Sequence, residues 1–341
     1  MKKIDLDRTI IEATVDKALS EIRADPERTI RKLIDMGQGF AKGPFQKHFF
    51  DDAQTMMSNE ESAYYRLLKR VITEVDLEKL RTFGLNLGYN GCTKGANVIR
   101  RREAELRFNI PWALSFILDT GDGCTSALEL DRAITQGKEL GVYVYLLFYR
   151  SNRLEETLRL LDTHDDCAFV LFLNPAYLIP QAINELQRRQ NILLSVTAGQ
   201  PGTDSTARTL REKRFLFALH TVYHAQDVDV CMTRAHMENV TAYAPLFYFL
   251  LAAGDCHAQD IEAMGHRVDE VRNAQRYPVL PIDMMHDMLT IDHVISEDAC
   301  AVVFDEYGRA CDYRGVYQPG GHSIREKPLI DILKASNPKK A

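Results

Sequence analysis

The sequence predicts an α/β fold: a (β/α) barrel or partial barrel, with a helical segment before it and a small hairpin after it. Two observations carry this prediction. Beyond Pro111, apolar runs of strand length alternate with amphipathic stretches of helix length. These runs are apolar at nearly every position, which is typical of parallel strands covered on both faces. An open, doubly wound sheet is the alternative architecture.

Residues 1–107 predict a helical N-terminal segment. Apolar residues such as Ile11, Val15 and Leu19 recur on one helical face, so a helix is expected over 9–22. Further helices are expected over 26–36, 62–75, 77–81 and 96–107. The Gly- and Asn-rich stretch 83–92 predicts a loop that lets the backbone come close to a neighbour.

Residues 108–297 predict the barrel domain. Its strands are expected at 113–118, 142–148, 168–173, 192–196, 215–221 and 246–251, with a weaker one at 279–282. Helices are expected between them at 127–140, 153–161, 180–189 and 206–212, and later at 261–275. This order predicts successive βα units with right-handed crossovers.

Residues 298–341 predict a small C-terminal cap. Within it, 301–311 has two short strand-like runs around an acidic turn that ends at Gly308, which predicts a hairpin. The amphipathic stretch 327–335 predicts a closing helix.

The charge balance and the apolar runs bear on partners and location. The chain has 42 Lys and Arg against 48 Asp and Glu, so it offers no basic excess for a nucleic-acid backbone. The longest apolar stretches, 142–148 and 246–253, are far shorter than the roughly 20 residues that a membrane-spanning helix needs. The N-terminus becomes acidic before any apolar run, unlike a signal peptide. We therefore expect a cytoplasmic protein without nucleic-acid or membrane partners.

The seven cysteines are widely spaced and form no CxxC pair. An odd number of cysteines in a chain of this size favours reduced thiols over a disulfide framework. The missing pairs disfavour zinc ribbons and thioredoxin-like redox sites.

Three stretches of the chain resemble the radical-SAM family. Residues 109–120, Asn-Ile-Pro-Trp-Ala-Leu-Ser-Phe-Ile-Leu-Asp-Thr, resemble the first barrel strand, and 130–144 resemble the first helix and second strand. The hairpin at 301–311 is similar to a terminal element of members with extra clusters. Residues 86–90, Asn-Leu-Gly-Tyr-Asn, resemble a bacterial subgroup with a degenerate first loop. The resemblance implies a radical-SAM-type barrel.

The sequence departs from the family at its cofactor motifs. The family holds a [4Fe–4S] cluster with three cysteines in a CxxxCxxC loop, whereas residues 119–127 contain only Cys124. The family's Gly-Gly-Glu-Pro segment, which cradles S-adenosylmethionine, is replaced by Phe-Tyr-Arg-Ser-Asn at 148–152. The resemblance with these losses implies a pseudoenzyme, and we expect neither the cluster nor S-adenosylmethionine as cofactor.

Candidate site residues follow the expected strands, because ligands of parallel barrels bind at the carboxyl ends of the strands. The candidates for ligand binding are Asp119, Cys124, Tyr149, Arg150, Asn174, Thr197, Gln200, Tyr223, Cys256 and His257. The candidates for acid–base catalysis are His220, His224 and Asp283, since a nearby carboxylate tunes a histidine. Arg150 suits bidentate binding of a carboxylate or phosphate, with a surface ion pair as the alternative.

The metal content and the function stay open at this point. Several residues near the expected strand ends are of types that bind zinc or iron, although they lack the tight spacing of a metal motif. They are His220, His224, Cys256, His257, Asp283 and His286. The first hypothesis is a non-catalytic protein that binds a small molecule, a peptide or a partner protein at the barrel mouth. The second is an enzyme that uses the His, Asp and Cys rim, with or without a metal. The third is a radical-SAM enzyme with atypical cluster ligation.

Overall fold

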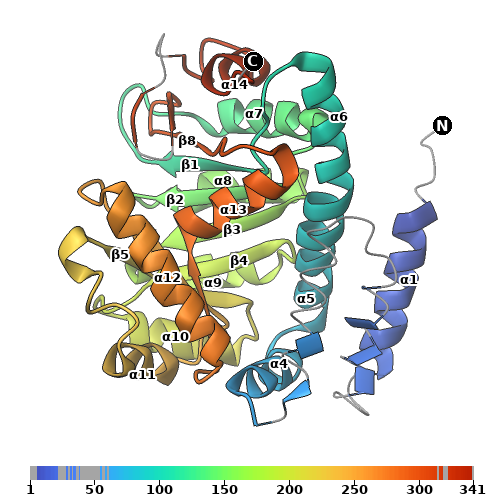
Figure 1. Ribbon diagram of the computed structural model, residues 1–341, viewed down its shortest axis with the longest axis vertical. Coiled ribbons are helices and arrows are strands. Elements are labelled where there is room, and N and C mark those ends of the chain that lie inside the picture. Colours follow the sequence, from blue (N-terminus) through green and yellow to red (C-terminus); the bar gives the residue numbers. More distant parts are fainter. Residues whose placement is uncertain are drawn as a thin grey trace.

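The computed structural model describes residues 6–21, 61–312, 315–317 and 322–339, together with scattered positions between 28 and 59. The expected helix over 26–36 is described at only some positions, all of them helical. In Figure 1 the strands form one curved sheet with helices around it.

The sheet is a partial barrel of nine strands in the order β7-β6-β5-β4-β3-β2-β1-β8-β9. Strands β1 to β8 are parallel and β9 is antiparallel to β8. The strands are β1 Ala113–Leu118, β2 Val144–Tyr149, β3 Ala168–Leu173, β4 Ile192–Thr197, β5 Phe217–Tyr223, β6 Phe247–Ala252, β7 Leu280–Asp283, β8 Val302–Phe304 and β9 Ala310–Asp312. Because β1 to β7 neighbour one another in chain order, the doubly wound alternative was wrong and the partial barrel is confirmed.

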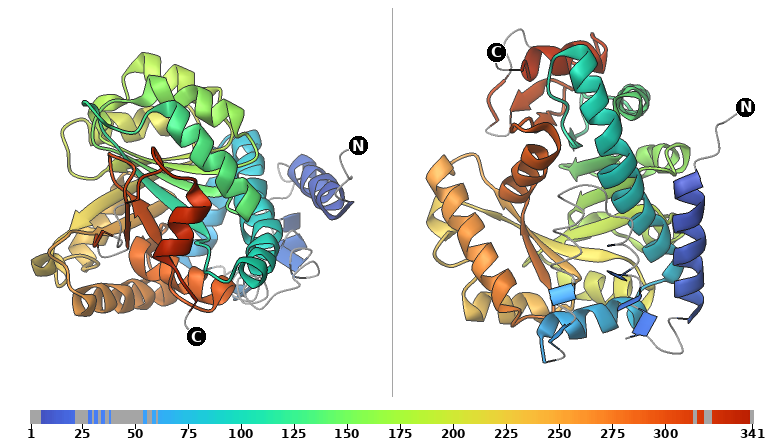
Figure 2. Two further views of the ribbon diagram at one scale, coloured as in Figure 1. Left: turned by 90° about the horizontal axis from the view of Figure 1, so that it is seen from above. Right: turned by 45° about the vertical axis from the view of Figure 1, so that its right-hand side comes forward.

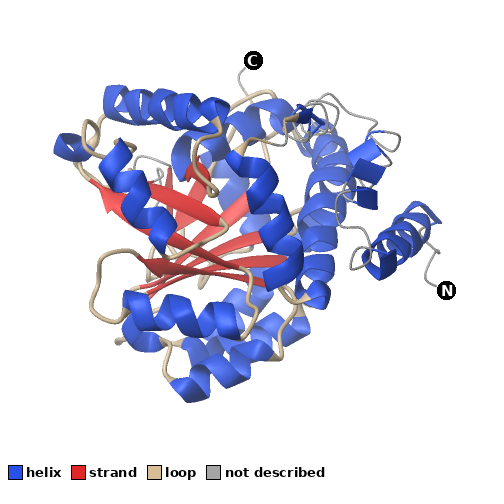
Figure 3. Ribbon diagram, turned by 90° about the horizontal axis from the view of Figure 1, so that it is seen from below, coloured by secondary structure: helices blue, strands red, loops and turns tan. Residues whose placement is uncertain are grey.

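Helices cover the outer face of this sheet, as Figures 2 and 3 show. They are α7 Ala127–Leu140, α8 Leu154–Thr163, α9 Pro180–Gln187, α10 Thr203–Glu212, α11 Arg234–Ala242 and α12 Ala258–Ala274. Two short 3-10 helices, η2 Pro175–Tyr177 and η3 Ala225–Asp227, follow β3 and β5. The chain closes with α13 Met284–Ser296, the β8–β9 hairpin and α14 Leu329–Ser336.

Sequence patterns missed α11 and α13. The helix α13 directly follows β7, with no Gly or Pro between them to end the apolar run. Its residues Met284 and Met288 pack on the inner face of the sheet, and Asp292 accepts a hydrogen bond from the backbone N–H of Trp112, just before β1. This helix therefore connects the two sides of the partial barrel.

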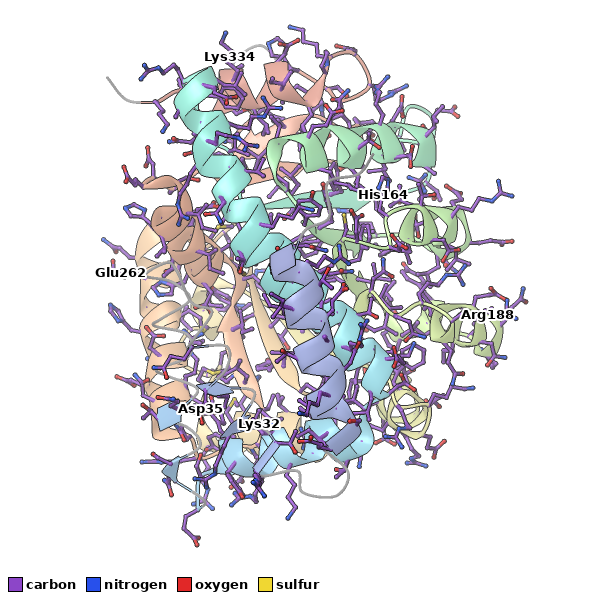
Figure 4. All side chains as sticks on the ribbon, turned by 90° about the vertical axis from the view of Figure 1, so that its right-hand side faces the viewer. Lys32, Asp35, His164, Arg188, Glu262 and Lys334 are labelled. Carbon is purple, nitrogen blue, oxygen red and sulfur yellow. The ribbon has the colours of Figure 1, made fainter. Side chains whose placement is uncertain are left out.

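The described N-terminal helices are α1 Leu6–Glu21, α4 Ala63–Glu74, α5 Leu77–Gly84, η1 Leu85–Gly95 and α6 Ala96–Leu106. The last three form one continuous helix along the edge where the strands begin (Figure 1). Figure 4 shows this edge from the side, with α1 in front of the long helix.

The expected loop over 83–92 was wrong, because Leu85–Gly95 is a π-helix with i→i+5 hydrogen bonding. The wider turn places Asn86, Asn90, Gly91 and Gly95 against the barrel. A Cβ atom on Gly91 would lie 2.9 Å from Val144 Cγ2, so this helix packs closer than a side chain would allow. The Gly and Asn residues serve close packing and hydrogen bonding here, which overrides their low helix propensity.

Buried side chains of this long helix and a half-buried arginine of α4 bind the backbone just before four of the strands. Each donates to carbonyl oxygens that the sheet itself leaves unpaired. The donor and acceptor pairs are Arg70 with Pro245 and Pro278, Lys79 with Gln187 and Arg189, Asn86 with Asp165 and Cys167, and Asn90 with Asp166. The amino end of the partial barrel is thereby closed.

Within the described residues, no helix is both long enough and apolar enough to span a membrane.

Candidate functional site: the mouth of the partial barrel

The carboxyl end of the partial barrel is open, which the inward-facing residues of β5 show most clearly. Ala218 is 0% exposed, His220 6% and Val222 48% along the same face of the strand. Because alternate residues of a strand face the same side, this series runs from the packed floor to solvent. We call this opening the mouth, defined by the inward-facing residues Phe148, Thr197, His220, Val222 and Leu251.

Aromatic rings form the floor and wall of the mouth. Phe148 and Phe172 stack with their centroids 4.3 Å apart, and Phe172 lies 5.5 Å from Phe249. The imidazole of His220 meets the Phe172 ring edge-on at 5.3 Å. A ligand entering the mouth would therefore meet a mostly apolar wall with a single imidazole in it.

Both ring nitrogens of His220 are hydrogen bonded. Nδ1 lies 3.0 Å from Ser195 Oγ, and Nε2 lies 3.1 Å from Thr197 Oγ1. Thr197 donates its own hydrogen to the Leu173 carbonyl, so its oxygen accepts from Nε2–H, which leaves Nδ1 to accept from Ser195. Burial lowers the pKa of His220 to about 4, so the ring is neutral at pH 7.

His224 lies at the rim and forms a different pair. Its Nδ1 is 3.0 Å from Asp255 Oδ1, and both side chains are about half exposed. This geometry orients the imidazole and leaves Nε2 without a partner among the described residues. Such a histidine–carboxylate pair is the arrangement that suits proton transfer.

His224 and His257 begin identical four-residue stretches, His-Ala-Gln-Asp, after β5 and β6. In both, the aspartate accepts a hydrogen bond from the backbone N–H of the histidine, at 2.9 Å for Asp227 and 2.8 Å for Asp260. The repeat thus forms the N-terminal caps of η3 and α12. This repetition is a signal that points to the rim, and the sequence interpretation missed it.

Three predicted site residues face the outer layer instead of the mouth. The Tyr223 hydroxyl donates to Asp283 Oδ2 at 2.9 Å, and both residues are fully buried. Asp283 also caps α13, and burial raises its pKa. The Tyr149 hydroxyl pairs with Thr157 at 2.7 Å beneath α8. These side chains hold helices on the sheet and do not reach a ligand at the mouth.

Cys256, Asn174 and Gln200 lie at the rim with structural partners. Cys256 Sγ contacts the Tyr223 carbonyl oxygen at 3.4 Å. Asn174 caps η2 through the Ala176 N–H. The backbone carbonyl of Gln200 accepts from Thr203 at the start of α10.

Arg150 is 55% exposed and pairs with Glu306 at 3.1 Å. Its backbone carbonyl accepts a hydrogen bond from the Tyr177 hydroxyl at 2.8 Å. The structure thus places Arg150 in the surface ion pair that was the alternative to anion binding.

The β1–α7 loop, residues 119–126, carries Asp119 and Cys124 and is held from three sides. The contacts run from Arg153 to the carbonyls of Asp119 and Thr125, from the Thr125 N–H to the Glu306 carbonyl, and from Arg325 to the Gly123 carbonyl. Burial and the charge of Asp119 raise the pKa of Cys124, which disfavours its thiolate.

This loop does not fit the cube that the family's CxxxCxxC motif holds, since it supplies one thiol where three are needed. Among the described residues, no three His, Cys, Asp or Glu side chains come together in a way that could hold a metal ion. The residues His220, His224, Cys256, His257, Asp283 and His286 are therefore not brought into one ligand set.

Solved structures resemble this half barrel, although no protein-family model and no curated protein matches the chain. SuiB from Streptococcus suis, bound to S-adenosylmethionine, matches with a TM-score of 0.52 and 12% identity over 70% of this chain and 67% of SuiB. SuiB bound to its precursor peptide SuiA matches equally well, over 70% and 68%. The similarity to anSMEcpe with bound AdoMet and a peptide is lower, with a TM-score of 0.41 and 11% identity over 65% and 80%.

The SuiB structures show that the chain has a radical-SAM-type fold, as the resemblance implied. They also overturn one expectation. We expected no cofactor, because the motifs for the cluster and for S-adenosylmethionine are lost, yet SuiB, which has this fold, binds S-adenosylmethionine. Loss of these two motifs is therefore not a sufficient reason to expect no cofactor, because the fold presents many backbone and side-chain groups to a ligand.

Proposed function

We propose that this chain is a peptide-binding protein of the radical-SAM fold, with a degenerate β1–α7 loop. The exposure series along β5, from Ala218 to Val222, carries the proposal because it shows an open, apolar mouth above a neutral floor. SuiB bound to SuiA supports a peptide as ligand of this fold.

Exposed apolar side chains around the carboxyl ends of the strands support the same proposal. Five large apolar residues that solvent reaches lie near strand ends, in the loops that follow the strands or in the first turn of α7: Leu128, Ile179, Val222, Val230 and Tyr307. A gathering of such residues around one opening is typical of a surface that binds an apolar partner. A peptide could place alternate side chains against this rim and into the mouth.

His220 has a positioning role in this proposal. Its two nitrogens are occupied by Ser195 and Thr197, so it would have to break a hydrogen bond before exchanging a proton with a ligand. A neutral ring held in this way instead fixes the shape of the floor.

The proposal is tested by panning a random peptide library against the immobilised full chain. Selected peptides are expected to be rich in apolar residues. Val222→Lys should weaken their binding at least about tenfold, because a charge replaces an apolar contact. Val294→Lys is the matched control, since Val294 is 37% exposed on α13 near the closed amino end. Selection of no peptides, or equal binding by the two variants, would contradict the proposal.

S-adenosylmethionine is the second ligand to test at the mouth. Equilibrium dialysis with labelled S-adenosylmethionine, with and without a selected peptide, shows whether this chain shares the ligand of SuiB. Iron and sulfide analysis of anaerobically purified protein tests the β1–α7 loop directly, because a four-iron centre needs ligands beyond Cys124.

The pair His224–Asp255 favours a second candidate function, acid–base catalysis on a ligand at the rim. The pair orients one imidazole nitrogen and leaves the other accessible. In that case, His224→Gln and Asp255→Asn should each abolish or sharply reduce turnover of a selected peptide while leaving its affinity unchanged. Loss of turnover in neither variant would remove this candidate.

A further inference from the structure

A second cavity lies on the outer face of the sheet, away from the mouth. It has a volume of about 630 Å³ and opens between α10 and α11, over Thr221 and Tyr248. Ligand pockets commonly have roughly 300–1,000 Å³. Side chains alternate along a strand, so Thr221 points away from the side that His220 and Val222 face. We call this cavity the α10–α11 groove, and it is separate from the proposed peptide site.

A chain of hydrogen bonds forms the base of the groove. His236 Nε2 lies 2.7 Å from the hydroxyl of Tyr248, and the Thr221 side chain hydrogen bonds the same hydroxyl. Tyr248 is fully buried, which fixes its position. The groove therefore has a preorganised polar floor, and among the described residues His236 Nδ1 has no hydrogen-bond partner.

The lining carries little charge. Burial lowers the pKa of His236 and raises that of Tyr248, so both are neutral at pH 7. The described lining contains no Lys or Arg, and its one carboxylate, Asp204 at the outer edge, pairs with Arg208 of α10 at 3.1 Å. The lining itself offers no cation, and the nearby Arg208 is already paired with Asp204, so a phosphate ester should bind more weakly than its neutral parent.

The remaining lining supplies a ring face and an amide. Tyr243 is half-buried, and Asn239 is exposed at the same helix. Hydroxyl groups of a ligand can both donate and accept, which matches the mixture of amide, imidazole and carboxylate here. The aromatic ring offers a flat face to the C–H groups of a saturated ring.

We propose that the α10–α11 groove binds an uncharged sugar ring, either as a free sugar or as the ribose of a nucleoside. The groups that carry the proposal are His236, Asn239, Tyr243 and Asp204, above the fixed hydroxyl of Tyr248. This site lies outside the mouth and does not depend on whether the mouth binds peptides.

The test uses the full chain with four probes: glucose, glucose 6-phosphate, adenosine and AMP. Binding is measured by isothermal titration calorimetry and saturation-transfer NMR. We expect glucose or adenosine to bind with a Kd of about 1 mM or tighter. The phosphate ester of whichever compound binds should bind at least about tenfold more weakly. Comparison of glucose with adenosine distinguishes a free sugar from a nucleoside as the ligand.

Variants locate the bound probe. Asn239→Ala and His236→Phe should each weaken binding about tenfold, the loss expected for one hydrogen bond between ligand and protein. Asn239 is exposed, so its variant should fold normally. Asn184→Ala, an exposed position on α9, is the matched control and should leave binding unchanged.

Three outcomes would overturn the proposal. The first is that neither glucose nor adenosine binds. The second is that a phosphate ester binds as tightly as its neutral parent, and the third is that the groove variants leave binding unchanged. If Val222→Lys abolishes adenosine binding while Asn239→Ala does not, the nucleoside occupies the mouth and the groove assignment is wrong.

Discussion

The two ends of the partial barrel differ in what their polar groups do. At the amino end, the buried side chains of Lys79 and Asn86 bind backbone carbonyls. At the carboxyl end, the inner face opens until Val222 is 48% exposed. The hydrogen bonds at the amino end hold helices on the sheet, whereas the carboxyl end is the one we propose for ligands, a division common among (β/α) barrels.

The largest expected effect on stability concerns Asp292, which lies at the amino end and tests whether that end is buried. It is buried and accepts a hydrogen bond from the Trp112 N–H at 2.9 Å. Burial raises the pKa of Asp292 in the folded protein to about 7, from its ordinary value of 3.8. Between these values the folded protein keeps a proton that the unfolded chain has lost, so stability falls as pH rises from about 4 to 7.

We expect Asp292→Asn to remove most of this pH dependence, on the order of 4 kcal/mol over the window. The asparagine oxygen still accepts from Trp112, so folding should persist. Urea denaturation at several pH values measures the effect, with Asp331→Asn, exposed on α14, as control. If both variants keep the pH dependence of the natural chain, Asp292 does not titrate as a buried acid and water reaches the amino end.

How much the sequence predicted differs between elements, and the reasons are physical. The bounds of α7 were predicted because its ends are local: Ser126 and Glu129 form a capping box, and Gly141 has a φ of 102°. The helix over 85–95 was not predicted, because it is stabilised by hydrogen bonds from Asn86 and Asn90 to carbonyl groups far away in the sequence.

The site was predicted less well than the fold. Strand ends could be located, but strands that are apolar on both faces do not show which alternate residues face inward. His220 and Thr197 face the mouth, whereas Tyr149 and Tyr223, placed at the same rim by the sequence, face the outer helices. That choice depends on where the helices pack, which no local pattern records.

The second prediction concerns Lys79, which is 2% exposed. Its Nζ lies 2.7 Å from the carbonyl oxygens of Gln187 and Arg189. Lys79→Met leaves both carbonyls buried without a donor, at about 1–3 kcal/mol each. Relief of the buried charge offsets part of this cost, so we expect a net loss of about 3 kcal/mol. The urea midpoint should fall with an unchanged m-value.

Two controls place that loss at the amino end. Lys334→Met, an exposed position on α14, should leave the urea midpoint unchanged within error. Val222→Lys at the mouth should also cost less than about 0.5 kcal/mol, since the residue is half exposed. A mouth variant as destabilising as Lys79→Met would show that both ends carry stability, against the comparison.

The smallest expected change in stability comes from alanine substitutions at two glycines of the π-helix. A Cβ on Gly95 would lie 2.6 Å from the Asn90 carbonyl and 3.2 Å from the Tyr143 ring, whereas a Cβ on Gly88 would have no neighbour within 4 Å. Gly95→Ala should therefore destabilise the protein by about 1–3 kcal/mol through overpacking. Gly88→Ala should stabilise it by about 0.5 kcal/mol, because alanine restricts the unfolded chain more than glycine does. Thermal unfolding of both variants decides the matter. If the two substitutions shift the melting temperature in the same direction, the close packing of this helix on the start of β2 is not what closes the amino end.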